Sequence, residues 1–218
     1  MTEPTYIIGI DLGTTNSVVA YALANPGEGP NPVRIFEIPQ IISPGVVENR
    51  PLLPSFILVP GGPDAASGAM GLPWNPGNDT AVGVFAQKRG AELPAQLIAS
   101  SKSWLCHTLV DRKKPILPWE GKDETVKLSP VEASARIIKH IRDAWDFQMA
   151  REDESLAMAF QDVTLTVPAS FDAVARELTV QSAEMAGLSR ITLLEEPQAA
   201  FYAWLDATDG GWRDRVAA

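Results

Sequence analysis

The sequence predicts an α/β fold in which helices flank a mixed sheet. Residues 7–20 hold two short apolar runs around a turn of Gly, Thr and Asn, a pattern typical of a β-hairpin. Residues 163–167 and 191–194 have the pattern of strands, and the segment between them has the start and stop signals of a helix. A strand, a helix and a second strand in this order predict a right-handed crossover between parallel strands.

The composition is that of an ordinary globular protein. The chain has 218 residues, 45% of them hydrophobic, which is enough for a sizeable core in one or two domains. The net charge of −9 argues against a nucleic-acid partner, which usually requires a basic surface. The sequence has no apolar run of membrane-spanning length and no signal-like N-terminus, so we expect no membrane partner and a cytoplasmic location. Cys106, the single cysteine, is expected in the core.

Short strands and turns are expected after the first hairpin. Residues 33–38 and 53–59 have the pattern of strands, and residues 82–90 that of a short helix. Residues 60–80 are rich in Gly, Pro, Ala and Asn, so we expect an exposed and disordered loop. Trp74 either fixes this loop to the body of the protein or forms a contact patch.

A long amphipathic helix is expected after residue 128. Ser129, Pro130 and Glu132 match a capping box with proline at the first helical position. Apolar residues then recur at spacings of three and four as far as Trp145, which gives the helix one buried face. His140 falls outside that stripe and is expected at the surface.

The crossover helix and the element after the last strand have clear boundary signals. Asp172 is expected to cap the crossover helix and Gly187 to end it. Pro197 opens a further helix. The predicted buried face of the crossover helix carries Val174, Leu178 and Met185.

The turn of the first hairpin is a candidate binding site. Its amides and two hydroxyls can face one small space, and a concave set of N–H groups binds anions such as phosphate. These residues are Gly13, Thr14, Thr15 and Asn16. Asp11 lies at the rim, where a carboxylate would hold a metal ion directly or through water. Similar turns also occur in hairpins that bind nothing, and this one lacks the Gly-Lys-Ser/Thr ending of a Walker A loop.

Two stretches near the ends of the chain resemble the 70-kDa heat-shock chaperones (DnaK-type), which share a superfamily with actin and the sugar kinases. The stretches are GIDLGTTNSVVA and VTLTVPASFDAVARELTVQSAEMAGLSRITLLEEPQAAFYAWL, whereas the middle third matches weakly. The resemblance implies a ribonuclease-H-like fold of the actin-like ATPases. Subdomain IA would comprise residues 1–40 and 128–218, and a smaller inserted α/β subdomain IB would comprise residues 41–127.

The resemblance also implies binding and hydrolysis of ATP with Mg²⁺. The turn residues Gly13 to Asn16 would cradle the phosphates, and Lys102 would reach the γ-phosphate and the attacking water. Glu196 would orient that water, and Asp11 and Glu196 would hold Mg²⁺ through water. Considered without the resemblance, Lys102 is an ordinary solvated charge and Glu196 a favourable charge at a helix N-terminus.

The resemblance gives Pro168 and Arg176 a further role. They match positions that couple the nucleotide state to peptide binding, although a proline after a strand and an arginine on a helix also have ordinary structural explanations. The sequence departs from the family at Gln198, Ser170 and Glu195, where the family prefers Thr, an aromatic residue and often Asn.

No segment matches the second phosphate loop, lobe II or the peptide-binding domain of the family. We therefore expect a fragment that holds lobe I and is inactive alone. Its expected partners are the nucleotide, the missing lobe II and peptide-binding domain, co-chaperones and client peptides.

Two alternatives come from other functional classes. A filament-forming actin relative of the cell-shape type also carries a Glu-Glu-Pro and Ala-Ala step like residues 195–200. A sugar kinase would need a sugar-binding aspartate in the cleft, and no segment matches it. We expect the intact protein to be a chaperone that uses ATP hydrolysis to change its grip on a client.

Overall fold

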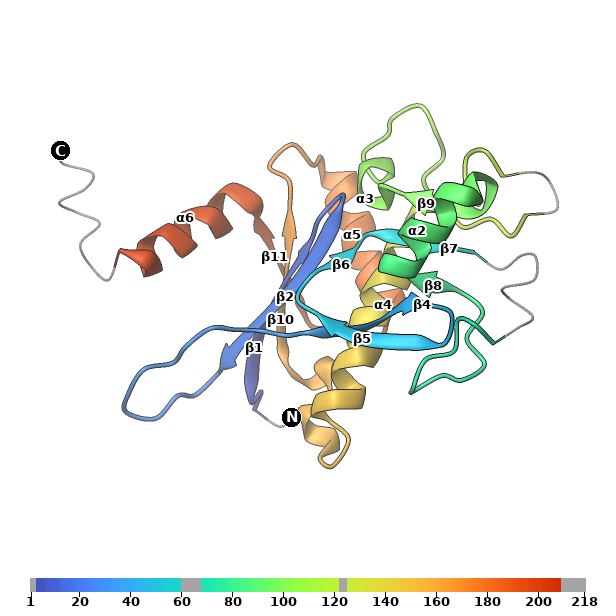
Figure 1. Cartoon of the computed structure of the whole chain (residues 1–218). Helices are drawn as coiled ribbons and strands as arrows, with labels where there is room; N and C mark the ends of the chain where they lie inside the picture. Colours follow the sequence, from blue (N-terminus) through green and yellow to red (C-terminus); the bar gives the residue numbers. More distant parts are fainter. Residues whose placement is uncertain (1–2, 60–67, 122–124, 209–218) are drawn as a thin grey trace.

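A computed structural model describes residues 3–59, 68–121 and 125–208, and a mixed six-stranded sheet lies at its centre (Figure 1). The strand order is β11-β10-β1-β2-β3, and β6 also pairs with β2. β1 runs antiparallel to β2 and parallel to β10, which runs parallel to β11. The predicted mixed α/β class is confirmed. The bounds are β1 Tyr6–Leu12, β2 Asn16–Leu23, β3 Arg34–Ile35, β6 Leu53–Pro54, β10 Asp162–Val167 and β11 Ile191–Glu195.

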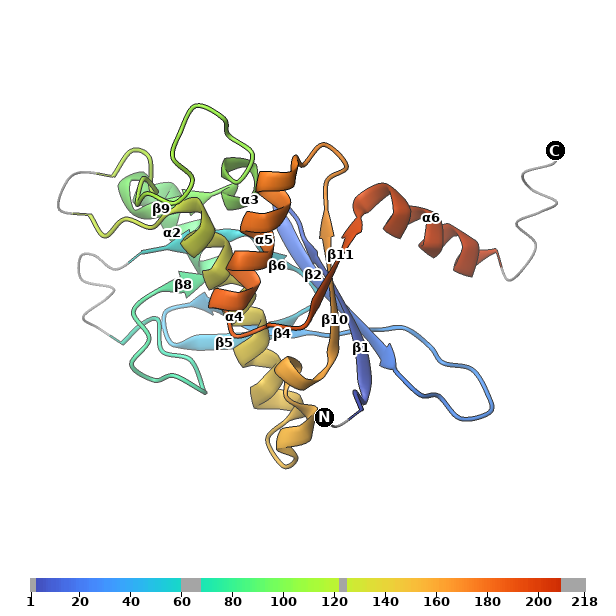
Figure 2. The ribbon, with the colours of Figure 1, turned by 180° about the vertical axis from the view of Figure 1, so that it is seen from behind.

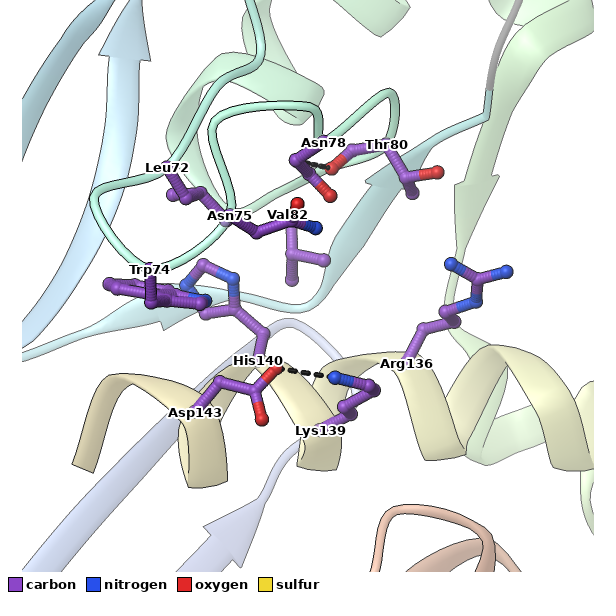
Figure 3. Close-up of a pocket in the computed structure, with 10 residues that line it drawn as sticks. All are labelled: Leu72, Trp74, Asn75, Asn78, Thr80, Val82, Arg136, Lys139, His140 and Asp143. Carbon is purple, nitrogen blue, oxygen red and sulfur yellow. Dashed lines mark hydrogen bonds and ion pairs between the residues drawn. The ribbon is translucent and has the colours of Figure 1, made fainter. Parts of the chain in front are cut away.

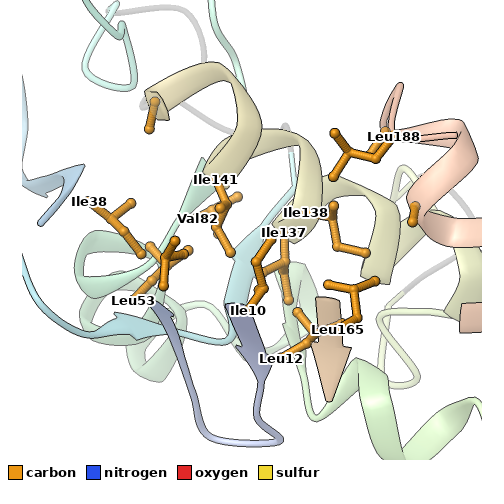
Figure 4. Close-up of a cluster of buried hydrophobic side chains, with 14 of the residues drawn as sticks. Ile10, Leu12, Ile38, Leu53, Val82, Ile137, Ile138, Ile141, Leu165 and Leu188 are labelled. Atoms are coloured by element: carbon orange, nitrogen blue, oxygen red, sulfur yellow. The ribbon is translucent and has the colours of Figure 1, made fainter. Parts of the chain in front are cut away.

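Two helices, α4 (Pro130–Met149) and α5 (Ala173–Met185), cover one face of this sheet (Figures 1 and 2). Successive side chains of a strand point to opposite faces. Ile10 on β1 is therefore fully buried beneath α4, whereas Asp11 next to it is exposed on the other face. Figure 4 shows the apolar layer between α4 and the sheet, with labelled residues that include Ile10, Leu12, Ile137, Ile138, Ile141 and Leu165.

The start of α4 agrees with its sequence signals, but the burial of one side of the helix differs from the prediction. The Ser129 hydroxyl accepts a hydrogen bond from the Glu132 N–H, and the Glu132 carboxylate accepts one from the Ser129 N–H, so the capping box is confirmed. The surface position predicted for His140 is wrong, because its side chain is buried and its Nε2 lies 3.0 Å from the Pro39 carbonyl oxygen. The Trp74 ring packs edge-on against the imidazole, so the segment around residue 74 covers this flank of α4.

The predicted ends of α5 are confirmed. Asp172 accepts a hydrogen bond from the Ala175 N–H, and Gly187 takes a φ of +84° after the last turn. The predicted buried face is only partly right, because Val174 and Met185 are each 51% exposed while Leu178 is buried. The buried face consists of small residues that let α5 approach α4 closely, namely Ala175, Thr179, Ser182 and Ala183 with Leu178.

Apart from β6, the elements between residues 38 and 104 form smaller sheets and helices beside the main sheet (Figure 1). The two strands predicted at 33–38 and 53–59 are each broken. The second break comes at Ser55, whose N–H donates to the Thr15 carbonyl while the chain passes from β6 to β7. The bounds are β4 Ile38–Ser43, β5 Val46–Arg50, β7 Phe56–Leu58, β8 Ala81–Val82, α2 Val84–Glu92, η1 Pro94–Gln96, β9 Leu97–Ala99 and α3 Ser101–Trp104.

Two further expectations are corrected by burial. The expected loop at 60–80 lies partly outside the described residues, but from residue 68 onward it is ordered, with Met70 and Leu72 buried and Trp74 packed on the body. Cys106 is exposed rather than in the core, because the neighbouring Leu105 takes the buried position and the Cys106 thiol faces outward, donating to the Ser103 carbonyl. Within the described ranges, no helix is long and apolar enough to cross a membrane.

The last elements follow α4. Two short 3₁₀ turns lead into β10, and α6 follows β11 directly and extends away from the sheet (Figure 2). Pro197 lies in the first turn of α6, as predicted. The bounds are η2 Glu154–Leu156, η3 Met158–Phe160 and α6 Glu196–Ala207.

Candidate functional site

The candidate site lies where the parallel strands β1, β10 and β11 end at the same edge of the sheet. In the register of the sheet, Leu165 pairs with Ile10 on one side and with Leu193 on the other. The β1–β2 turn, the end of β10 and the start of α6 therefore come to one edge. Ligands of open α/β sheets commonly bind beyond the carboxyl ends of such strands.

The β1–β2 turn requires glycine at one position. A Cβ atom on Gly13 would lie 2.2 Å from the Asn16 carbonyl oxygen, so only a residue without a side chain fits the turn. The predicted phosphate-turn side chains that follow it, Thr14, Thr15 and Asn16, are exposed. The turn is fixed from below by Ser55, whose hydroxyl donates to the Gly13 carbonyl at 2.7 Å.

Asp11 is oriented by a neighbouring strand. Its Oδ1 atom accepts a hydrogen bond from the Thr166 hydroxyl on β10 at 2.7 Å. The exposed carboxylate thus stands on the open face of the sheet, next to the β1–β2 turn. It retains acceptor capacity for a hydrated cation.

Lys102 and Glu196 come together although they are 94 residues apart in the sequence. Lys102 Nζ donates to Glu196 Oε1 at 2.6 Å. Lys102 lies on α3 and is only 4% exposed, so the alternative of a solvated charge is wrong. The Glu196 side chain keeps 44% exposure and begins α6. The pair therefore consists of a buried cation and a carboxylate that remains partly exposed to solvent.

A second ion pair lies directly behind Glu196. Arg176 on α5 donates from Nη2 to Glu195 Oε1 at 2.6 Å and from Nε to the Phe171 carbonyl at 3.1 Å. The Phe171 N–H in turn donates to the Pro168 carbonyl at 3.0 Å. The two residues predicted to act in coupling, Pro168 and Arg176, thus belong to one hydrogen-bonded chain that ends beside Glu196.

Three residues of this site received no role from the sequence. Thr166 could have been found from the strand alternation of 163–167 and its parallel pairing with β1. Glu195 stands out in the sequence only as a departure from the family, and its carboxylate is what gives Arg176 an ion pair. Ser55 has no such signal, because its contact with Gly13 depends on the chain's path between β6 and β7.

The donor set fits a Mg²⁺ ion that keeps most of its water. Asp11 lies near the end of β1 and Glu196 follows β11, with β10 between them, so the two carboxylate residues come from the same end of three parallel strands. Mg²⁺ typically retains several waters and binds through one or two carboxylates together with phosphate oxygens. Among the residues that the structure describes, no group of three or more His, Cys, Asp and Glu could hold a metal by itself.

The chain is similar to chaperones over nearly its whole length. The model of the Hsp70 protein family matches residues 77–213. The chain is 32% identical over 209 residues to "Chaperone protein HscA" of Klebsiella pneumoniae, covering 93% of this chain and 29% of that protein. It is 32% identical over 207 residues to a "Chaperone protein HscA homolog" of Cupriavidus pinatubonensis, covering 90% of this chain and 28% of that protein. The chain spans less than a third of the length of these relatives.

The matched region includes Lys102 on α3, Pro168 directly after β10, Arg176 on α5 and Glu196 at the start of α6. The similarity favours the chaperone interpretation over the actin-like filament and the sugar kinase. The chain belongs to the Hsp70 family.

Proposed function

We propose that this chain is lobe I of the nucleotide-binding domain of an Hsp70-type chaperone and supplies residues that bind and hydrolyse Mg-ATP. We assign it a ribonuclease-H-like fold, with subdomain IA in residues 1–40 and 128–218 and subdomain IB in residues 41–127. The observation that carries the proposal is the Lys102–Glu196 contact, since it joins two elements far apart in the sequence.

The β1–β2 turn would bind the β- and γ-phosphates. Its amides can face outward together because the turn closes tightly around Gly13. A Cβ atom at this position would lie only 2.2 Å from the Asn16 carbonyl oxygen. The hydroxyls of Thr14 and Thr15 and the amide of Asn16 are exposed and can add donors. Ser55 would keep the turn in this shape without a ligand, so that little order has to be gained on binding.

Lys102 and Glu196 would act on the γ-phosphate and the attacking water. A γ-phosphate oxygen would share the Lys102 ammonium with Glu196, and the cation would stabilise the charge that develops in the transition state. Glu196, which remains partly exposed, would accept a hydrogen bond from the water and orient it in line. A Mg²⁺ ion held through water by Asp11 and Glu196 would neutralise phosphate charge.

The hydrogen-bonded chain from Pro168 to Glu195 would connect this site to the rest of the protein. A shift of Glu196 would move the adjacent Glu195. Hydrogen bonds would pass the shift on to Arg176 and to the Pro168–Phe171 turn. The expected partners are lobe II, a peptide-binding domain, co-chaperones and client peptides, in the cytoplasm. The result of this coupling would be a change in how tightly the client peptide is bound.

Binding of Mg-ADP tests the phosphate turn. In calorimetric titrations of the full-length polypeptide, Gly13→Ala is expected to lower the affinity for Mg-ADP by at least tenfold, because the turn cannot keep its shape. Gly27→Ala is the matched control, since a Cβ there meets nothing within 4 Å. Equal affinity of both variants would refute the proposed phosphate site.

A further inference from the structure

A cavity lies on the far flank of α4, between that helix and residues 72–82 (Figure 3). Its volume is about 90 Å³, well above the roughly 10–15 Å³ that one buried water needs. Its lining includes the side chains of Trp74, Asn75, Arg136, Lys139, His140 and Asp143. None of these residues belongs to the site at the sheet edge.

His140 presents an unused acceptor to this cavity. A carbonyl oxygen only accepts, so the ring nitrogen 3.0 Å from the Pro39 carbonyl, Nε2, must donate. Burial lowers the pKa of His140 from 6.5 to about 4, so the ring is neutral at pH 7 and Nδ1 carries a lone pair. The imidazole is 94% buried and lines the cavity beneath Trp74, and Nδ1 has no partner among the described residues.

The cavity has an excess of positive charge within an acidic protein. Asp143 is the one carboxylate among its lining residues, and it is already paired with Lys139 at 2.5 Å and with Arg142. Arg136 has no ion pair within the described part of the chain, and Figure 3 shows its side chain rising from α4 toward Thr80. An anion would therefore find an unpaired guanidinium and an adjacent ammonium on one helix face.

The positive charge of the cavity favours an anion, and the free acceptor Nδ1 of His140 favours an anion that also carries a proton. We propose that the cavity binds orthophosphate in its protonated forms, with Arg136 and Lys139 on the anionic oxygens and His140 Nδ1 accepting the P–OH hydrogen bond. Asn75, whose side chain makes no hydrogen bond within the described residues, can contribute an amide donor. Sulfate has the same shape but no proton near neutral pH, so it would leave Nδ1 unsatisfied. The proposal does not depend on the proposed ATPase function.

The test is calorimetric titration of the full-length polypeptide at pH 7 and constant ionic strength. Orthophosphate is expected to bind at least tenfold more tightly than sulfate. Arg136→Gln and Lys139→Gln are each expected to lower the affinity for orthophosphate by at least tenfold. Lys88 is an exposed residue on α2, and Lys88→Gln should leave this affinity unchanged. Both variants replace partly or fully exposed helix positions, and unchanged circular dichroism would verify that they fold.

Four outcomes would overturn the proposal. Equal affinity for sulfate would mean that Nδ1 takes no part, and insensitivity to Arg136→Gln would mean that phosphate binds elsewhere. Loss of binding in Gly13→Ala, with binding kept in Arg136→Gln, would place the anion at the β1–β2 turn. Phosphoserine distinguishes the other source of the same chemistry: the cavity is small, so phosphoserine is expected to bind more weakly, and equal or tighter binding would overturn orthophosphate as the ligand.

Discussion

Two helices of this chain, α4 and α6, begin with the same sequence signal but differ in what stabilises them. Each has a proline in its first turn and a glutamate nearby. α4 is held by a capping box and buries Trp145 completely. α6 has no side-chain cap and no buried residue within its bounds, and Phe201 and Tyr202 are 52% and 59% exposed.

The difference separates a helix that stabilises the fold from a helix that contributes a residue to the candidate site. α4 supports the sheet through its apolar face, so its sequence is explained by burial. α6 contributes little to the core, and its first residue, Glu196, makes the contact with Lys102 on which the proposed function rests. Substitutions on the apolar face of α4 should therefore alter stability, whereas substitutions at the start of α6 should alter activity.

The largest stability effect should come from the core of α4. Trp145→Ala is expected to lower the free energy of unfolding by about 3–5 kcal/mol, because it empties a fully buried site and leaves the Leu156 carbonyl without its donor. Phe201→Ala in α6 is expected to change it by only about 0.5 kcal/mol. Urea unfolding followed by circular dichroism measures both, and similar losses would show that α6 is packed after all.

His140 should make the stability of α4 depend on pH. Its pKa is about 4 in the folded protein and 6.5 when exposed, so between these values only the unfolded chain takes up a proton. The free energy of unfolding should therefore fall as the pH is lowered from 6.5 to 4, by on the order of 3 kcal/mol. The raised pKa of Asp146, which burial causes, acts in the opposite direction.

Two histidine variants isolate this contribution. His140→Gln should remove the fall with acid when unfolding is measured in urea from pH 7 to pH 5, because glutamine cannot be protonated there. His107→Gln, at an exposed position, should keep the fall. The same pH dependence in both variants would assign the effect to other groups.

The smallest effect should distinguish the two helix starts. Ser129→Ala is expected to cost about 1 kcal/mol, because the Glu132 N–H loses its acceptor. Glu195→Ala should cost about 0.5 kcal/mol, because Glu195 makes no capping bond and its ion pair with Arg176 is partly exposed. Thermal unfolding of the two variants is the measurement, and a larger loss for Glu195→Ala would reverse the comparison.

Local signals predicted the elements of the fold well. The start of α4 and both ends of α5 followed from Ser129, Asp172 and Gly187, since caps and stops act within a few residues. Burial that depends on tertiary contacts was not predictable in this way. His140 is covered by a loop more than sixty residues earlier in the chain, and Cys106 is exposed while the adjacent Leu105 is buried.

The site was predictable only in part, and for the same reason. The need for glycine at position 13 follows from the sequence of one turn. The contacts of Lys102 with Glu196 and of Asp11 with Thr166 join distant segments, so neither could be derived from local patterns. Family resemblance suggested the role that is proposed for Lys102, and Thr166 and Glu195 became visible only through sheet register and the contact with α5.

The most direct test of the central claim is single-turnover hydrolysis of bound Mg-ATP by the full-length polypeptide. Glu196→Gln is expected to bind Mg-ATP within about threefold of the unaltered protein and to hydrolyse it about 10²–10³-fold more slowly, since the water loses its carboxylate acceptor. Glu184→Gln, an exposed position on α5, should hydrolyse it at the unaltered rate. Hydrolysis by Glu196→Gln at the rate of this control would contradict the assignment of the Lys102–Glu196 pair as the catalytic centre.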